Sequence, residues 1–444
     1  MNNTTKLRWF ILLPGLAMWL GWGIRGEFGH STGAMIPGAF LALALWILLP
    51  GKKFSRGLLI ALSAVGFGFG GGMTTLESAG MAIGHYSYVP NATVLGYSGL
   101  VLKGALWALF GGAGLGVAFT ASRYRLKDII LAGIFMAGSY YAGWALINRP
   151  KLLYFSVDRP ESWGGLLFAA IVLLVWLTVR GHTRIPLVLA LCAAASAAIG
   201  YPIAVTIHGY ALYHHSGFWY HWWRVAETTF GTFMGVGLGL GTYFIKDELP
   251  DTQEVVRPIA GPLMGPWGIV FSVALAALCT ALYQHDLPWI ILGSFLWCAA
   301  YYSDQIAWYI GVAMTYYVTA ARVVRYWLHN QHLGNPFILW TLVALATLVV
   351  SWKVTTWWRK TDKTTARNVL VFTVWAILTL DYLQNFINRA VLVASPHAVA
   401  AAGGRWPYTL WAWGDEMVVD AFFTVAAILL TWLAYRASRP RACE

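Results

Sequence analysis

The chain has 444 residues, of which 59% are hydrophobic and only 11% are charged, and its formal net charge is +12. Long apolar runs recur along its whole length, which excludes a water-soluble globular protein and indicates a chain that crosses a membrane repeatedly. The basic residues form short clusters directly after these runs, so they favour anionic membrane lipid, and not nucleic acid, as their partner.

In chain order, the apolar segments are interpreted as membrane-spanning helices. They lie near 7–24, 33–50, 57–75, 96–120, 128–147, 164–179, 185–207, 221–245, 261–283, 288–303, 306–327, 335–353, 368–390 and 416–435. The sequence therefore predicts an all-α, polytopic integral membrane protein with about fourteen transmembrane helices in a single transmembrane domain. Because cytoplasmic loops are enriched in Lys and Arg, we expect the cytoplasmic (inner) membrane, with both termini in the cytoplasm.

The segment 288–327 permits two interpretations. A single helix would place Lys353 and Arg359 on the outer side, against the charge bias of the other loops. Two helices joined by a turn near Ser303–Asp304 keep these basic residues inside. We therefore predict two helices.

Residues 57–127 and 185–250 resemble each other in the order of their apolar, polar and glycine-rich stretches. Duplicated helix bundles are common in transporters, which usually bind substrate between the repeats. The alternative is chance similarity between apolar, glycine-rich helices. The sequence therefore indicates a possible internal four-helix duplication, with 57–127 and 185–250 as its repeat units.

Polar side chains gather at the predicted outer turns. The first turn contains Arg25, Glu27 and His30, and the second contains Glu77 and His85. All histidines except His182 fall on this side. The glycine run 66–72 before the second turn is consistent with an unwound helix, but close helix packing through small residues is the simpler interpretation.

The seventh and eighth predicted spans enclose a third polar turn, which contains His208 and His214. Arg224 and Glu227 follow, three residues apart on one helical face, where they can pair. Such a buried pair has a purely structural interpretation as well as a functional one. The aromatic residues of 213–223 form either an interfacial belt or a stacking platform for a sugar or polyol.

The thirteenth span carries polar residues on one continuous face. A stripe of this kind is costly in lipid, so it must face protein or water; helix–helix hydrogen bonding is the structural alternative. The next span begins with acids, which complement a helix dipole, although one of them lies deeper in the span. The candidate residues of the two spans are Asp381, Gln384, Asn385, Asn388, Arg389, Glu416 and Asp420.

Two further patterns bear on the chemistry of the chain. Lys103, in the fourth span, either extends its amino group to the outer interface or pairs with a carboxylate. The histidines and acids match neither a metal-binding spacing nor a hydrolase motif, so no metal ion, cofactor or catalytic residue is assigned.

These features favour a transporter with an outward-opening polar cavity for a small polar solute: a sugar, a polyol or an organic acid. Glu227 or Asp381 is expected to carry a coupling proton, since a carboxyl group in a low-dielectric cavity can exchange protons near neutral pH. The alternative is an integral-membrane transferase or hydrolase that acts at the outer leaflet on a lipid-linked or glycan substrate. Paired carboxylates, or His with Asp or Glu, would do the acid–base work. Polar groups on one side only are typical of such an enzyme.

Overall fold

The computed structural model describes residues 3–28, 30–50, 52, 54–71, 75–157, 159–214, 222–249, 266–282, 286–315, 342, 345–346, 349–350, 363–394 and 407–439. Every regular element named among them is helical. The elements are α1 (Asn3–Arg25), η1 (Gly26–Phe28), α2 (His30–Gly33), α3 (Met35–Leu48), α4 (Arg56–Gly70), α5 (Leu76–Ala82), α6 (Ala92–Phe119), η2 (Ala121–Arg123), α7 (Leu126–Gly143), the π-helical turn η3 (Trp144–Asn148), α8 (Trp163–Gly181), α9 (Ile185–His214), α10 (Trp222–Ile245), α11 (Pro266–Leu282), α12 (Asp286–Tyr302), α15 (Lys363–Ala394) and α17 (Pro407–Ser438).

Among the described residues, seven helices are long and apolar enough to cross a membrane. They are Thr4–Arg25, Ala92–Phe119, Leu126–Asn148, Trp163–Gly181, Ile185–Ala211, Lys363–Leu383 and Met417–Ser438. Shorter apolar helices, including α3 and α4, lie between them. The prediction of an all-helical, multi-pass membrane protein is therefore supported.

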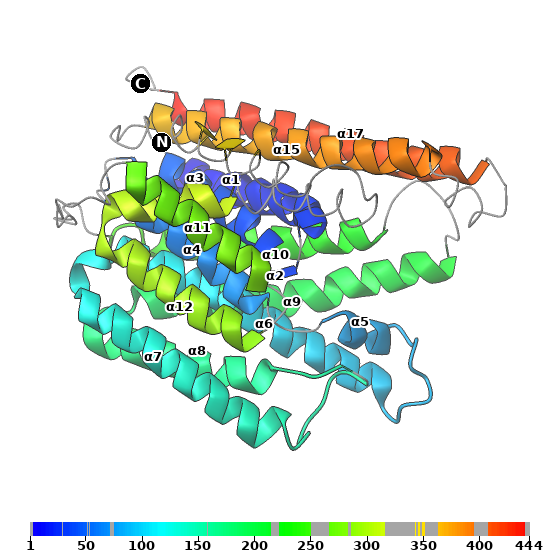
Figure 1. Ribbon diagram of the computed structural model, residues 1–444, viewed down its shortest axis with the longest axis horizontal. Coiled ribbons are helices and arrows are strands. Elements are labelled where there is room, and N and C mark those ends of the chain that lie inside the picture. The colour runs from blue at the N-terminus through cyan, green and yellow to red at the C-terminus, as the bar shows by residue number, and fades with distance from the viewer. Residues whose placement is uncertain are drawn as a thin grey trace.

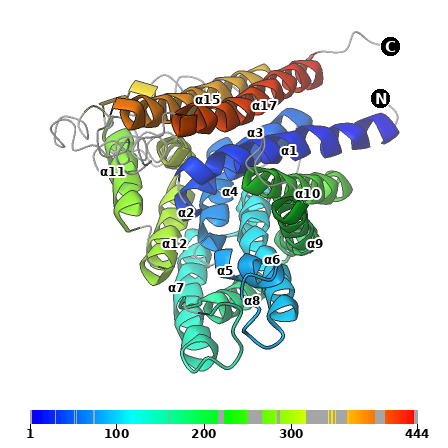
Figure 2. The same cartoon turned by 90° about the vertical axis from the view of Figure 1, so that its right-hand side faces the viewer.

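The helices run side by side in one bundle (Figure 1). Seen from its end, α15 and α17 form a layer over α1 and α3, while α7 and α8 lie at the opposite edge (Figure 2). Helix α3 is buried from Met35 to Ile47. At ~1.5 Å per residue its 14 residues measure about 21 Å, less than the ~30 Å of a bilayer core. A short helix is tolerated here because protein surrounds it.

The outer helices expose large aliphatic side chains. Ile134 of α7, Val175 of α8 and Ile199 of α9 each show more than half of their surface. The same helices direct small or aromatic residues inward, such as Ala132 and Tyr140. An apolar exposed face around a packed interior is the arrangement that lipid permits and water does not.

Close packing between helices depends on glycines. A Cβ on Gly112 or Gly116 of α6 would meet the backbone of α9 within 2.5 Å, and one on Gly239 of α10 would meet the Phe10 carbonyl of α1 at 1.8 Å. Gly66 of α4 has the same role against Phe110. The predicted helix-packing role of the glycine run 66–72 is supported at Gly66. Among the helices that the structure describes, α6 with α9 and α1 with α10 pack most extensively.

The helical break predicted near Ser303 is present. Helix α12 ends at Tyr302, and residues 304–315 are helical again. Gly293 in the middle of α12 lies against Phe69 near the end of α4, whereas Gly57 at the start of α4 lies against the beginning of the segment 304–315. Helix α12 therefore packs along α4 towards the first residues of α4, and the second helix begins beside those residues.

Candidate functional site

A charged triad (Arg25, Arg224 and Glu227) lies buried where α1 ends and α10 begins. The Arg25 Nη2 donates to Glu227 Oε1 at 2.9 Å, and the Arg224 Nη1 donates to Glu227 Oε2 at 3.2 Å. No more than 8% of any of the three residues is exposed. The predicted Arg224–Glu227 pair is confirmed, and Arg25 joins it from the first hairpin, 202 residues away.

The local structure explains why these side chains meet. Arg25 is the last residue of α1, where a cation complements the negative end of the helix dipole. Glu227 lies in the second turn of α10 and Arg224 one turn before it, so both point from the same face. Gly26 completes the site, because a Cβ there would lie 2.1 Å from Arg224 Nη1. Any larger residue at this position would require the guanidinium group of Arg224 to move.

Aromatic rings enclose the Arg25 side chain. Its guanidinium carbon lies 4.6 Å from the Trp22 ring centroid and 5.0 Å from that of Trp107. Trp22 meets Phe230 edge-on, and Phe230 stacks on Tyr201 at 4.4 Å. The Trp22 indole N–H has no hydrogen-bond acceptor among the described residues. Cation–π contacts compensate part of the cost of burying a guanidinium group.

Further contacts reach Glu227 from the side of His208. Trp223 Nε1 donates to Glu227 Oε1 at 3.2 Å, and the Trp223 ring meets the His208 ring edge-on at 5.2 Å. Glu227 therefore accepts from three separate donors, and the surrounding groups come from α9 and α10 as well as α1.

A separate network holds the loop 149–162, which connects η3 to α8. Lys103 Nζ donates to Glu161 at 2.5 Å and to Ser78 Oγ at 2.8 Å, and Glu161 also accepts the Phe155 N–H at 3.0 Å. Burial raises the pKa of the Tyr154 hydroxyl, which accepts the Glu161 N–H at 3.2 Å. Of the two alternatives for Lys103, pairing with a carboxylate is the one observed.

Glu77 belongs to this loop network. Its carboxylate pairs with Arg159 at 3.1 Å and accepts the Val157 N–H at 2.8 Å. The backbone bond closes the loop onto the start of α5. His85, in the turn after α5, is exposed. The second predicted outer turn therefore clamps a loop, while the first and third turns form the triad.

The last hairpin contributes a third polar region. Asp381 is buried on α15, with 1% of its surface exposed. Beside it, the Tyr382 hydroxyl donates to the Asp420 carbonyl of α17 at 2.7 Å and contacts Thr424. Asp420 itself is half-buried. Helix α17 packs against the last turn of α1 through Phe423, whose ring would lie 2.5 Å from a Cβ on Gly23.

Several predicted site residues have side chains outside those that the structure describes. These are Glu27, His30, His214, Gln384, Asn385, Asn388, Arg389 and Glu416. Their assignment to the site stays a prediction. Among the described residues, no group of three or more His, Cys, Asp or Glu is arranged to hold a metal ion.

Sequence reasoning did not assign Trp22, Trp107, Tyr201 or Glu161 to any site. Trp107 is fully buried in α6, a helix whose composition is otherwise that of ordinary packing. A large aromatic residue among glycines was the available signal, since glycine leaves room for a ring to pack against backbone. Glu161 carried no periodic signal, because it lies in an irregular loop.

No protein-family model, no curated protein and no solved structure matches this chain.

Proposed function

We propose that the protein is a membrane transporter for a small polar solute, with the charged triad at the centre of its binding site. The observation that carries this proposal is the convergence of two arginines on one buried carboxylate, from helices far apart in the sequence. Ionisable residues within membrane helices are costly and are most often found at substrate or ion pathways. The aromatic rings around Arg25 supply the flat apolar surfaces that organic solutes require.

Among the three solute classes expected, an organic acid fits this geometry best. Arg25 and Arg224 both bind the Glu227 carboxylate, so their guanidinium groups are already placed to bind a second carboxylate in its place. A solute carboxylate that takes over these two donors releases Glu227. We propose that the released Glu227 carboxylate then carries the coupling proton inward with the solute. Inward release of the solute restores the ion pairs and discharges that proton inside.

The enzyme alternative receives less support from the same geometry. A lipid-linked or glycan substrate is bulky, whereas Arg25, Arg224 and Glu227 expose less than a tenth of their surfaces. A small solute needs only a limited opening between α1 and α10. We therefore propose transport, in a protein that crosses the inner membrane about fourteen times with both termini in the cytoplasm.

Purified protein in liposomes tests the proposal. Uptake of labelled mono- and dicarboxylates, hexoses and polyols is compared with and without an acidic exterior. We expect acid-stimulated uptake of a carboxylate. The Glu227→Gln variant should lose the stimulation, and Arg224→Gln should lose uptake. Glu248→Gln, which neutralises an exposed carboxylate just after the end of α10, serves as the matched control. Equal uptake by wild-type and triad variants would refute the proposal.

A further inference from the structure

A cleft lies at the opposite end of the bundle from the triad, where basic helix ends converge. Its volume is about 470 Å³, within the ~300–1,000 Å³ typical of ligand pockets. Five basic side chains line it, from five different helix ends or the turns beside them. They are Lys6, Lys52, Lys246, Lys363 and Arg439.

Among the residues that the structure describes, basic side chains outnumber acids in this basic cleft. Asp247 is the one acid among these lining residues, and it is paired with Lys246 at 3.1 Å. Lys52 is held in position, since its Nζ donates to the Leu249 carbonyl at 2.8 Å. Lys6 and Arg439 make no ion pair within the part of the chain that the structure describes.

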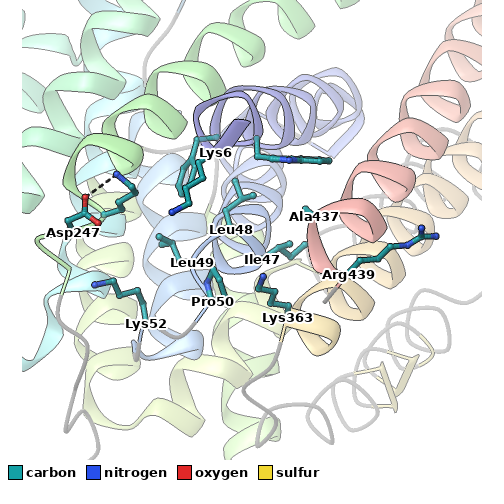
Figure 3. Close-up of a pocket in the computed structure, with 13 residues that line it drawn as sticks. Lys6, Ile47, Leu48, Leu49, Pro50, Lys52, Asp247, Lys363, Ala437 and Arg439 are labelled. Carbon is teal, nitrogen blue, oxygen red and sulfur yellow. Dashed lines mark hydrogen bonds and ion pairs between the residues drawn. The ribbon is translucent and has the colours of Figure 1, made fainter. Parts of the chain in front are cut away.

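Figure 3 shows Lys6, Lys52 and Lys363 arranged around Leu49 and Pro50 at the end of α3. These lysines come from the first turn of α1, the turn after α3 and the first residue of α15. The cations surround an opening instead of following one helix face. Several point charges around one opening suit an anion of more than one charge or with several oxygen atoms, which is the chemistry of a phosphate group.

The walls of the basic cleft are apolar. Phe10, Ile47 and Leu49 are buried beneath the lysines, and the half-buried Trp9 lies at the edge. Tryptophan is typical of the boundary between headgroups and acyl chains. A cationic mouth above an apolar wall matches an amphiphile whose phosphate is followed by hydrocarbon. A free phosphate ion would leave that wall unused.

We propose that the basic cleft binds a phosphate group, and that the group belongs to the headgroup of an anionic phospholipid. The lipid would join the ends of α1, α3, α10, α15 and α17, which are distant in the sequence and meet at this cleft. The site is independent of the triad and of the solute that the triad binds.

The test uses the full-length protein in detergent and measures its melting temperature. Phosphatidylglycerol, phosphatidylcholine and inorganic phosphate are titrated separately. We expect a saturable rise in melting temperature with phosphatidylglycerol and no comparable rise with phosphatidylcholine. The Lys6→Gln/Lys363→Gln variant should need at least ten-fold more phosphatidylglycerol for half of the rise, because its two lost charges lie at the cleft.

The control variant Arg123→Gln/Lys127→Gln removes two charges from exposed positions around the start of α7. It should respond like the wild type. A saturable effect of inorganic phosphate that the cleft variant loses would support the phosphate site and reassign its source to solution. Equal responses to both phospholipids, or equal losses in the cleft and control variants, would overturn the proposal.

Discussion

Lys103 and Glu161 form an ion pair with almost no solvent contact: their side chains are 1% and 0% exposed, and the Nζ–Oε1 distance is 2.5 Å. Arg184 and Glu248 form a pair of the same length, yet their side chains are 70% and 39% exposed. Because the two ion pairs have the same length but different exposure, comparing them isolates the effect of burial on stability. In the first, loss of one partner leaves a charge in a dry interior, and in the second it leaves a charge in water.

The Glu161→Gln variant should therefore unfold more easily than the wild type, by about 3–5 kcal/mol. Adding Lys103→Met should recover part of the loss, since no isolated charge then remains and the introduced amide oxygen still accepts the Phe155 N–H. Arg184→Gln is the matched control and should change the melting temperature far less. Thermal unfolding in detergent measures all three. Equal effects of Glu161→Gln and Arg184→Gln would contradict the role assigned to burial.

The exposed Arg184–Glu248 pair predicts that the stability of the folded protein depends on pH. The Arg184 side chain, by hydrogen bonding and charge, lowers the pKa of Glu248 below its usual 4.5. A lowered carboxylate pKa stabilises the folded state above the unfolded value, and this contribution is lost as the pH falls through the folded value. The melting temperatures of wild type and Glu248→Gln should differ slightly at pH 7 and low salt, and converge as the pH falls below 4.5. A difference in melting temperature that grows as the pH falls would contradict this prediction.

Gly26→Ala should impair function through the triad. The added Cβ would lie 2.1 Å from Arg224 Nη1 and 3.1 Å from Glu227 Oε2, so the guanidinium group must move. We expect at least a ten-fold loss of uptake in liposomes. Gly138→Ala is the control, because a Cβ at Gly138 meets no atom within 4 Å. Normal uptake by both alanine variants would show that the triad geometry is dispensable.

Asp381 offers a separate test of proton coupling on α15. Asparagine keeps the size and hydrogen-bonding capacity of this buried side chain but cannot ionise. If Asp381 serves helix packing alone, Asp381→Asn should retain both stability and uptake. If Asp381 contacts the solute or carries a proton in addition to Glu227, the variant should fold stably but lose uptake. Melting temperature and uptake are measured side by side, and a fully active variant would remove Asp381 from the site.

Topology can be checked by labelling. After replacement of the four native cysteines, single cysteines at Ser87 and Ser122 provide exposed positions at opposite ends of α6. An impermeant thiol reagent should label Ser87→Cys on intact cells and Ser122→Cys only after permeabilisation. The opposite pattern would place the triad at the cytoplasmic side and the basic cleft outside.

Much of the fold could be predicted because hydropathy acts locally. The apolar segments that the structure describes coincide with helices, and the break at Ser303 followed from the charge balance of the loops. The Arg224–Glu227 pair was also predictable, since a spacing of three residues brings side chains together on any helix. In each case the signal lies in the hydropathy and charge of the chain itself.

The remainder of the site depends on contacts between distant segments. Nothing near Arg25 in the sequence indicates that Glu227 binds it, and nothing near Lys103 indicates Glu161. Glu77 was assigned to the same kind of site as Arg25, yet its partners are Arg159 and the loop backbone. These assignments require the packing of α1 on α10 and of the loop 149–162 on α6, which periodicity within one helix does not contain.

The separation between Arg25 and Glu227 also affects how the protein is made. Translation adds about 5–20 residues per second, so the 202 residues between them take roughly 10–40 s to synthesise. Throughout that interval the first hairpin has been synthesised while its carboxylate partner does not yet exist. Helix α1 therefore cannot reach its final setting when it first enters the bilayer. The final packing of α1 against α10 is therefore a late step of biogenesis. Stalling the ribosome before α10 is synthesised should leave a chain whose first helix is still accessible to the insertion machinery.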